Sequence, residues 1–206
     1  ISTPHGKGGV AVIRISGEDA FTIAEKFIFP KNKKSFSEMR ANSVFLADVK
    51  TPEGKLLDES LITIFRAPRS YTGENVVEIS CHGGILLTQN ILSAAFSAGA
   101  VQAGPGEFTR RAFSAGELSL TEAESVIGMI DAKTNAALSL AQRGISGSLR
   151  KKTEKIYTDI TSVIGNIYAI IDFPDEDLEQ MTRLDMENAM DSIIAELDAL
   201  KSSYRT

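Results

Sequence analysis

The sequence predicts an α+β domain over residues 1–118, followed by an all-helical domain, part of a bundle, over residues 119–206. Three observations lead to this prediction. Short β-branched stretches separated by glycine and proline turns fill the first part, whereas apolar residues recur every three or four positions from Thr121 onward. The charge also changes, because residues 1–118 carry a net charge of +1 and residues 119–206 a net charge of −6. We therefore place the boundary near residue 119.

The first elements of the α+β part are predicted as strand, helix and loop. β-Branched residues follow a glycine turn over residues 8–15, which predicts a buried strand. Helical spacing over residues 18–27 predicts a helix that ends before Pro30. The polar and basic residues 31–40 predict a loop.

Two further stretches predict the remaining strands. Residues 43–68 read as a strand, a tight turn at residues 52–54 and a second strand, because Pro and Gly supply the dihedral angles of a sharp reversal. Residues 76–81 predict another strand, whose side chains alternate between two faces. One face is expected to carry Val76, Glu78 and Ser80, and the other Val77, Ile79 and Cys81.

A helix is predicted after this strand. Gly83 and Gly84 open it, and it runs through Ala98 until Gly99 stops it. Residues 100–118 contain three glycines and little periodicity, so we expect a structured loop with short extended pieces.

The second part is predicted as three helices. Thr121 and Glu124 have the spacing of a capping box at the start of the first. Four of its apolar residues are expected toward one face: Ile127, Ile130, Ala137 and Leu138. The second helix covers about residues 148–171 and is stopped by Pro174, and the third covers about residues 184–203. Their apolar stripes are Ile156, Ile160, Val163, Ile167 and Ile170, then Met186, Met190, Ile193, Ile194 and Leu197.

Composition narrows the class of protein. With 43% hydrophobic and 24% charged residues the chain reads as a soluble globular protein, and no apolar run has the length of a transmembrane span. Residues 1–4 show no signal-peptide pattern, and the single cysteine excludes an intrachain disulfide, so we expect a cytoplasmic location. The acidic second part argues against strong RNA binding by this chain alone.

Two charged residues interrupt predicted strands. Arg14 lies between Ile13 and Ile15, and Glu78 lies in the stretch VVEIS. A charge in such a place must be paired or must face a cleft. The guanidinium of Arg14 suits a carboxylate, and the Glu78 carboxylate can accept hydrogen bonds from an amino-pyrimidinone ring such as a pterin. A structural salt bridge and a ligand contact both remain open for each residue.

Other polar motifs have weaker functional interpretations. Adjacent strand residues point to opposite faces, so Cys81 and His82 are not expected to form a catalytic dyad, and the sequence indicates no acidic partner for His82. Gly83 and Gly84 leave free N–H groups that could bind an anion, and two histidines with one cysteine give no metal-ligand spacing. We expect no metal site and no catalytic residue in this chain.

Three further motifs are open to a structural interpretation. Gly6, Gly8 and Gly9 form a glycine-rich loop that is a turn or a ligand-binding loop, but the P-loop pattern GxxxxGK[ST] does not occur in the sequence. Arg110 and Arg111 either bind a carboxylate tail or are solvated, and we expect one of them to be solvated. The acidic run from Asp172 to Glu179 is interpreted as a solvated helix junction.

Four stretches, in this order and spacing, resemble the tRNA-modifying GTPase family MnmE, also called TrmE. They are STPHGKGGVAVIRISG, PRSYTGENVVEISCHGG, GPGEFTRRAFSAGELSLTEAESV and IDFPDED. The resemblance implies an amino-terminal domain similar to the folate-binding domain of glycine-cleavage aminomethyltransferases, which binds tetrahydrofolate and forms a homodimer. It also implies that residues 119–206 are the first half of a helical domain, interrupted in the family by a Ras-like G domain that is absent here.

The resemblance also implies a function. In the family, the GTPase acts with the flavoprotein MnmG (GidA) to modify carbon 5 of the wobble uridine of certain tRNAs, with a carboxymethylaminomethyl-type substituent. It uses GTP, Mg²⁺ and K⁺. A methylene group of the substituent comes from a tetrahydrofolate derivative. The candidate forms of this cofactor are 5-formyl-tetrahydrofolate and 5,10-methylene-tetrahydrofolate. The chain alone is expected to lack GTPase activity.

By motif position, Arg14 and Glu78 match family residues that contact the folate. The third match falls at Glu117, where the family pattern usually has lysine, so the charge is reversed. Arg110 or Arg111 is a candidate replacement for that lysine. Two alternatives to this function stay open: an active folate-dependent one-carbon (aminomethyl) transferase, and a dimerisation scaffold without a working folate site.

Overall fold

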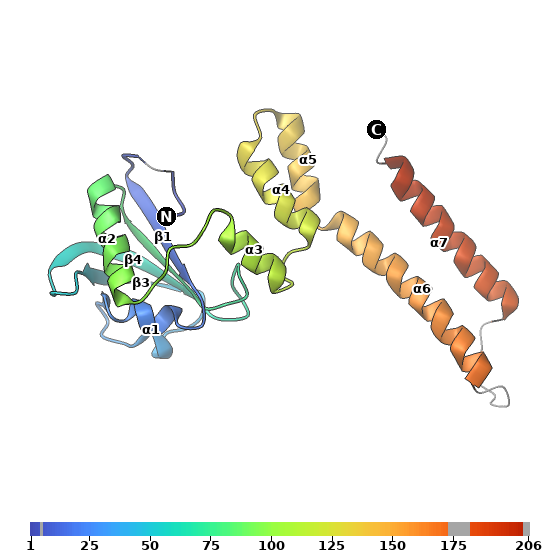
Figure 1. The fold of residues 1–206 in the computed structure, drawn as a ribbon, viewed down its shortest axis with the longest axis horizontal. Helices are drawn as coiled ribbons and strands as arrows, with labels where there is room; N and C mark the ends of the chain where they lie inside the picture. The colour runs from blue at the N-terminus through green and yellow to red at the C-terminus, as the bar shows by residue number, and fades with distance from the viewer. Residues whose placement is uncertain (5, 173–181, 204–206) are drawn as a thin grey trace. The chain divides into compact units, whose positions relative to one another are not determined.

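A computed structural model describes residues 1–4, 6–172 and 182–203 (Figure 1). The chain divides into two compact units, Ile1–Ala123 and Glu124–Thr206. The first is an α+β unit built on one antiparallel sheet, and the second is helical. We describe each unit by itself.

Five antiparallel strands form the sheet of the first unit, in the order β1-β5-β4-β3-β2. Their bounds are Val10–Ser16 for β1, Ile28–Pro30 for β2, Ser43–Lys50 for β3, Leu56–Phe65 for β4 and Val76–His82 for β5. The predicted strands over residues 8–15, 43–68 and 76–81 are therefore confirmed.

The turn between β3 and β4 is the predicted one. The Thr51 N–H donates to the Lys55 carbonyl at 2.8 Å, and the Gly54 N–H donates to the Thr51 carbonyl at 2.9 Å. Gly54 has φ +85°, a left-handed conformation that glycine adopts without strain. The sequence PEG therefore closes the hairpin because Gly54 adopts this left-handed conformation.

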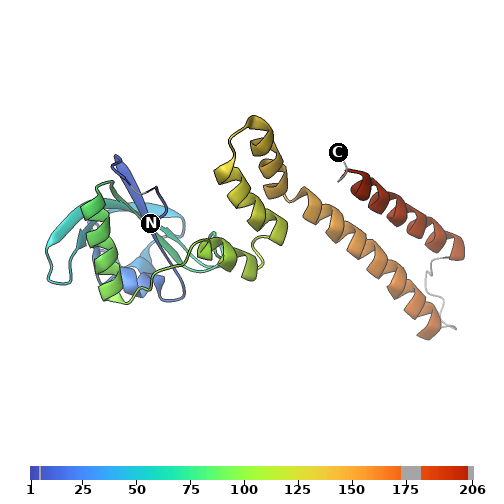
Figure 2. The same cartoon turned by 45° about the horizontal axis from the view of Figure 1, so that its top comes forward.

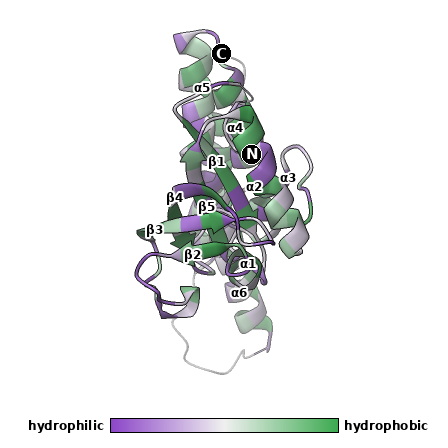
Figure 3. Cartoon of the chain, turned by 90° about the vertical axis from the view of Figure 1, so that its left-hand side faces the viewer, coloured by the Kyte–Doolittle hydropathy of each residue, from purple (hydrophilic) through white to green (hydrophobic). Residues whose placement is uncertain are grey.

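Helices α1 (Ala20–Ala24) and α2 (Ile85–Ala98) cover one face of the sheet (Figures 1 and 2). The core lies between them and this inner face, where Ile13, Ile62 and Ile79 have no exposed surface. Buried and exposed residues alternate along most of the strands. The opposite, outer face of the sheet carries Arg14 and Glu78 but also exposed apolar side chains, and the strands in Figure 3 show both hydrophobic and hydrophilic residues.

The helix predicted over residues 18–27 is shorter than expected. It ends at Ala24, and the chain then tightens, because the Phe27 N–H donates to the carbonyl of Ala24, three residues back. Ile28 begins β2, which pairs with β3, and both Phe27 and Ile28 are buried. Burial and strand pairing thus override the helical spacing, and a three-residue strand is too short to show a pattern of its own.

Helix α2 begins and ends where the glycines predict. Gly84 is its N-cap, and Gly99 closes it with φ +114°. Residues 100–118, however, are not only a loop: α3 (Glu107–Ser114) lies within them, so that prediction was wrong. The helix has eight residues, about two turns, and lies between Gly106 and Gly116, so its apolar spacing is too short to stand out in the sequence.

The start of the second part contains two helices where one was predicted. They are α4 (Leu120–Asp131) and α5 (Asn135–Ile145). The Thr134 hydroxyl accepts a hydrogen bond from the Ala137 N–H at 3.1 Å and so begins a new helix. The four apolar residues that we expected on one face are therefore divided between two helices.

The capping box of α4 lies two residues before the predicted one. The Ser119 N–H donates to Glu122 Oε2 at 2.6 Å, and the Glu122 N–H donates to Ser119 Oγ at 3.3 Å. These reciprocal bonds satisfy two N–H groups at the helix start. Thr121 and Glu124 have the same spacing, so spacing alone did not identify the pair.

Helices α6 (Ser148–Asp172) and α7 (Arg183–Ser203) confirm the last two predicted helices. They lie side by side and antiparallel (Figures 1 and 2). Ile156, Val163 and Ile193 are buried, and Lys155 forms an ion pair with Glu196 across the two helices. Pro174 and the acidic residues 175–179 lie outside the described residues. Within the described residues, no helix has the length and apolar character needed to cross a membrane.

Candidate functional site

Arg14 and Glu78 lie directly opposite each other on neighbouring strands. The register of β1 and β5 pairs their Cα positions, and Arg14 Nε is 2.6 Å from Glu78 Oε1. The Arg14 side chain is 38% exposed and the Glu78 side chain 22% exposed, so the pair is open to a ligand. The salt bridge that the sequence analysis considered is therefore present, on the outer face of the sheet.

The backbone of β1 leaves further hydrogen-bonding groups beside this pair. Ser2 N–H donates to the Val12 carbonyl at 2.8 Å, and the Val12 N–H donates to Thr3 Oγ1 at 3.3 Å. The backbone groups of Val12 therefore point away from β5. Alternation in an antiparallel pair directs the N–H and C=O of Arg14 to the same side. Arg14 thus presents both its guanidinium and its backbone at the edge of the sheet.

A cavity of about 700 Å³ lies beside this edge. Its walls come from β1, α1, the end of α2 and residues 99–109. The charged residues in its lining are Arg14, Glu18, Asp19, Glu107 and Arg111. The two arginines offset two of the three carboxylates, and Glu107 is paired with Arg111, so the lining carries a small net negative charge.

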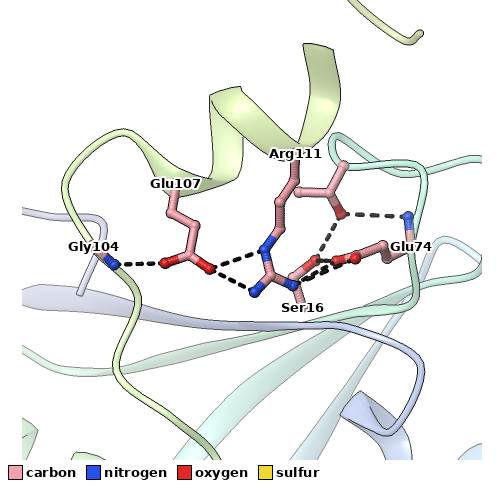
Figure 4. Close-up of polar contacts among 6 residues, drawn as sticks. Ser16, Glu74, Gly104, Glu107 and Arg111 are labelled. Atoms are coloured by element: carbon pink, nitrogen blue, oxygen red, sulfur yellow. Dashed lines mark hydrogen bonds and ion pairs between the residues drawn. The ribbon is translucent and has the colours of Figure 1, made fainter. Parts of the chain in front are cut away.

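One wall of this cavity is held by Arg111 on α3 (Figure 4). Its Nη2 is 2.5 Å from Glu107 Oε1, and its Nη1 is 3.1 Å from Glu74 Oε2. The second oxygen of Glu107 accepts a hydrogen bond from the Gly104 N–H at 2.7 Å. Arg111 therefore joins α3, the loop before it and the loop between β4 and β5.

This network changes two pKa values and extends to β1. The hydrogen bond from Arg111 holds the pKa of the Glu107 carboxyl below its ordinary value, and the same bond raises the pKa of the Arg111 guanidinium. Ser16 at the end of β1 donates to Glu74 Oε2 at 2.7 Å and is 2.7 Å from the Thr72 hydroxyl (Figure 4).

The two neighbouring arginines differ in their surroundings. Arg111 is held by two carboxylates, whereas Arg110 is exposed to solvent. The prediction that one of these two arginines is solvated is therefore confirmed. Because Arg111 already holds Glu74 and Glu107, it is a poor replacement for a ligand-binding lysine at position 117.

Glu117 lies apart from the Arg14–Glu78 pair. Gly116, at φ +77°, turns the chain after α3, and the Glu117 N–H donates to the Ala112 carbonyl at 2.9 Å. Glu117 then lies against Gly73, where an added Cβ would be 3.4 Å from Glu117 Oε1. It lines a second cavity, of about 480 Å³, and not the one that Arg14 lines.

Cys81 and His82 do not form a dyad. Cys81 is buried, its Sγ donates to the Ala11 carbonyl at 3.4 Å, and burial raises the pKa of its thiol. His82 instead contacts Asp58, with His82 Nδ1 2.8 Å from Asp58 Oδ1. Sequence reasoning missed Asp58, because only the packing of the strand ends brings residues 24 positions apart together.

Asp58 accepts several hydrogen bonds at the end of the β4–β5 ladder. The His82 N–H donates to its Oδ2 at 3.0 Å, and the Ser60 hydroxyl donates to the same oxygen at 2.9 Å. Burial alone would raise the pKa of the Asp58 carboxyl, but these bonds together with the His82 ring outweigh it, so the pKa lies below its ordinary value.

The two glycine-rich stretches meet at this end of the sheet. The Gly8 N–H donates to the Gly83 carbonyl at 3.1 Å, and a Cβ added at Gly83 would lie 2.4 Å from the Gly8 carbonyl oxygen. Glycine is required at position 83 for this close approach. Among the described residues, no group of three or more His, Cys, Asp or Glu side chains is placed to hold a metal ion.

The chain therefore belongs to the class of two-part proteins with an antiparallel α+β unit followed by a helical unit. The α+β unit carries the charged pair Arg14–Glu78 across two strands. Residues 1–117 match the family described as the GTP-binding protein TrmE N-terminus, and residues 120–206 match the MnmE helical domain. The chain is a member of the MnmE/TrmE family.

Comparison with individual proteins supports the same family membership. The chain is 40% identical over 205 residues to the tRNA modification GTPase MnmE of Carboxydothermus hydrogenoformans, and 40% identical over 206 residues to that of Symbiobacterium thermophilum. It is 43% identical over 182 residues to that of Chloroflexus aurantiacus. These alignments cover 99%, 100% and 88% of this chain but 44%, 45% and 40% of the relatives, so the chain spans less than half of their length.

Proposed function

We propose that the α+β unit binds a tetrahydrofolate derivative on the outer face of its sheet, through Arg14 and Glu78. The observation that carries this proposal is the ion pair of 2.6 Å between facing residues on β1 and β5. A carboxylate can accept two donors from an amino-pyrimidinone ring, and a guanidinium can donate to its carbonyl oxygen. The two side chains hold each other in position before the ligand arrives, which lowers the cost of binding.

The whole protein is proposed to be a tRNA modification GTPase, as its relatives are named. In this proposal it hydrolyses GTP with Mg²⁺ and K⁺ and acts with MnmG in the cytoplasm to modify the wobble uridine of tRNA at carbon 5. The folate bound by the α+β unit supplies the one-carbon group. The described chain contributes the folate-binding part and hydrolyses no GTP by itself.

We assign residues 1–118 to a folate-binding and dimerisation domain similar to that of the aminomethyltransferases, and residues 119–206 to the first part of the helical domain. The helical part leaves many apolar side chains exposed, for example Ile130 at 77% and Tyr157 at 73%. This exposure agrees with a domain that further helices of the same protein complete.

The homodimer is proposed to form through the α+β unit. The outer face of its sheet carries exposed apolar side chains in addition to the charged pair. Val10 is 62% exposed, Val44 59%, Leu61 50% and Leu46 40%. Exposed apolar side chains gathered on one face of a sheet are typical of a protein–protein interface.

Calorimetric titration with 5-formyltetrahydrofolate tests the folate proposal. The parent chain is expected to bind saturably, and Arg14→Ala to lose at least about tenfold in affinity, since it removes a charge-assisted hydrogen bond. Arg40→Ala, at an exposed position before β3, is the matched control and should bind like the parent. Equal binding by the Arg14 variant would refute the proposed site.

A dimerisation scaffold without a folate site is the second candidate. The charge at Glu117 favours it, because a carboxylate there repels the glutamyl carboxylates of a folate. No saturable binding by a parent chain that sediments as a dimer would support the scaffold and exclude the folate proposal.

A further inference from the structure

A group of basic side chains lies where α5 ends and α6 begins, and we name it the basic cluster. Residues 119–206 carry a net charge of −6, but the stretch 143–155 within them carries +4. All of the cations in this stretch are exposed. They are Arg143, Arg150, Lys151, Lys152 and Lys155. The net charge of the whole second part therefore does not describe this junction, which is positive.

The short connection between the two helices keeps the cluster together. Gly147 has φ +66°, and its carbonyl accepts a hydrogen bond from the Lys151 N–H at 2.9 Å, so α6 begins directly after it. The Ser146 hydroxyl donates to the Arg143 carbonyl at 2.7 Å. A connection of two residues thus keeps Arg143, in the last turn of α5, close to the first turn of α6.

Two of these cations are not neutralised by neighbouring side chains. Arg150 pairs with Glu154 at 2.8 Å, and Lys155 pairs with a carboxylate on α7. Lys151 and Lys152 form no ion pair in the part of the chain that the structure describes. The first turn of α6 contains no acidic residue, and the positive end of the helix dipole disfavours cations there. An anionic partner at this end offsets the repulsion.

An exposed aromatic ring lies beside the cluster on α6. Tyr157 is 73% exposed and follows Arg150 by seven residues. Seven residues are two helical turns, so both lie on the same side of α6, about 10 Å apart along its axis. Proteins bind single-stranded nucleic acid with cations on the phosphates and an aromatic ring stacked on a base. An acidic protein surface would use the cations but not the ring, so the combination favours a nucleic acid.

We propose that the basic cluster and Tyr157 bind the anticodon arm of the tRNA substrate, with the cations on its phosphates and the ring on an unpaired base of the loop. This inference rests on the proposed function of the whole protein and assigns it an RNA-contacting surface. The wobble uridine lies in the anticodon loop, and unpaired loop bases are accessible to protein side chains. Phosphate contacts carry no sequence information, so the cluster positions the RNA and does not select its sequence.

Fluorescence anisotropy with the whole chain tests the basic cluster. The probes are a labelled RNA hairpin with the sequence of an anticodon arm and a polyglutamate peptide of equal net charge. We expect the hairpin to bind with an affinity that falls steeply between about 50 and 200 mM salt, and polyglutamate to bind at least about tenfold more weakly.

Two double variants with the same change in charge locate the contact. Lys151→Gln with Lys152→Gln should lose about tenfold in affinity for the hairpin and reduce the slope of log affinity against log salt by about 1.5. Lys33→Gln with Lys34→Gln, at exposed positions of the α+β unit, is the control and should bind like the parent. Because the helix dipole disfavours Lys151 and Lys152, their replacement should not lower the temperature of thermal unfolding.

Tyr157→Leu separates stacking from charge. It removes the ring but no cation, so the hairpin should bind about fivefold or more weakly while the salt slope stays as in the parent. Unchanged affinity of this variant would refute the role of the ring.

The remaining outcomes separate the inference from the function on which it rests. Equal binding of the hairpin and polyglutamate would show a general attraction of anions and refute the RNA contact. No binding of the hairpin, or equal losses in the two double variants, would refute the role of the basic cluster. Modification of the wobble uridine by the whole protein measures the proposed function separately. Absence of that modification would refute the proposed function and this inference with it.

Discussion

Arg14 and Glu78 form a half-exposed ion pair, and such pairs contribute only about 0–1 kcal/mol to folding. The pair therefore contributes little to the stability of the sheet. A ligand that covers the pair removes water from both charges and strengthens its hydrogen bonds to them.

The Asp58 carboxylate has a different role, because it stabilises the end of the sheet. Its lowered pKa means that the folded state binds protons less readily than the unfolded state. Its contribution is therefore present above the unfolded pKa of about 3.9 and is lost as the pH falls through the folded pKa.

We predict that Asp58→Asn lowers the free energy of unfolding by about 1–3 kcal/mol at pH 7, since it weakens charge-assisted hydrogen bonds from His82 and Ser60. Its stability should also fall less steeply below pH 4 than that of the parent. Urea unfolding between pH 2 and pH 7 measures both effects, with Asp131→Asn, at an exposed position, as the control. Parallel pH curves for parent and Asp58→Asn would contradict the prediction.

At the scale of elements, α3 is held by polar side chains in addition to Ala112, its one buried residue. Arg111 ties it to Glu74, and the Tyr71 hydroxyl lies 3.0 Å from Thr109 Oγ1. The turn that follows α3 then positions Glu117 in the second cavity. The position of α3 therefore affects both cavities, because Arg111 lines the first and Glu117 lines the second.

We predict that Arg111→Gln loosens α3 locally without unfolding the unit. Amide hydrogen exchange over residues 104–118 should become several-fold faster, because the ties to Glu74 and Glu107 are lost, while exchange in β4 and β5 stays as in the parent. Exchange measured by mass spectrometry checks this, with Arg110→Gln as the matched control. Faster exchange throughout the sheet would show that Arg111 supports the whole unit instead.

The contact between the two glycine stretches is a second feature at this scale. We predict that Gly83→Ala destabilises the unit by about 1–3 kcal/mol, because the new Cβ would overlap the Gly8 carbonyl oxygen and the backbone must shift. Gly9→Ala is the control, since nothing lies within 4 Å of a Cβ there. Chemical denaturation compares the two, and equal stability of Gly83→Ala and the parent would show that the approach is not tight.

For the whole molecule, the outer face of the sheet is the candidate dimer interface. We predict that Leu61→Glu, a charge placed among exposed apolar residues, converts a dimer into a monomer in sedimentation velocity while circular dichroism stays unchanged. Leu86→Glu is the control, because Leu86 is 71% exposed on α2 and so lies away from that face. A Leu61→Glu variant that remains dimeric would move the interface elsewhere.

Local sequence patterns were sufficient to predict helices that glycines bound and strands with one buried and one exposed face. Alternation at Val77, Ile79 and Cys81 predicts which face of β5 is buried, and Gly84 and Gly99 bound α2. Helix α3 escaped prediction because its eight residues form only about two turns between Gly106 and Gly116.

The sequence by itself determined the α+β and helical parts, the buried faces of the strands, the hairpin turn and the two charged residues that interrupt the strands. Only the tertiary structure decided that Arg14 faces Glu78, that Asp58 holds His82, and that Glu117 shares a cavity with Arg69 instead of with Arg14. The physical reason is that periodicity and turn chemistry act between near neighbours in the chain, whereas strand register and loop packing join residues that lie far apart in it.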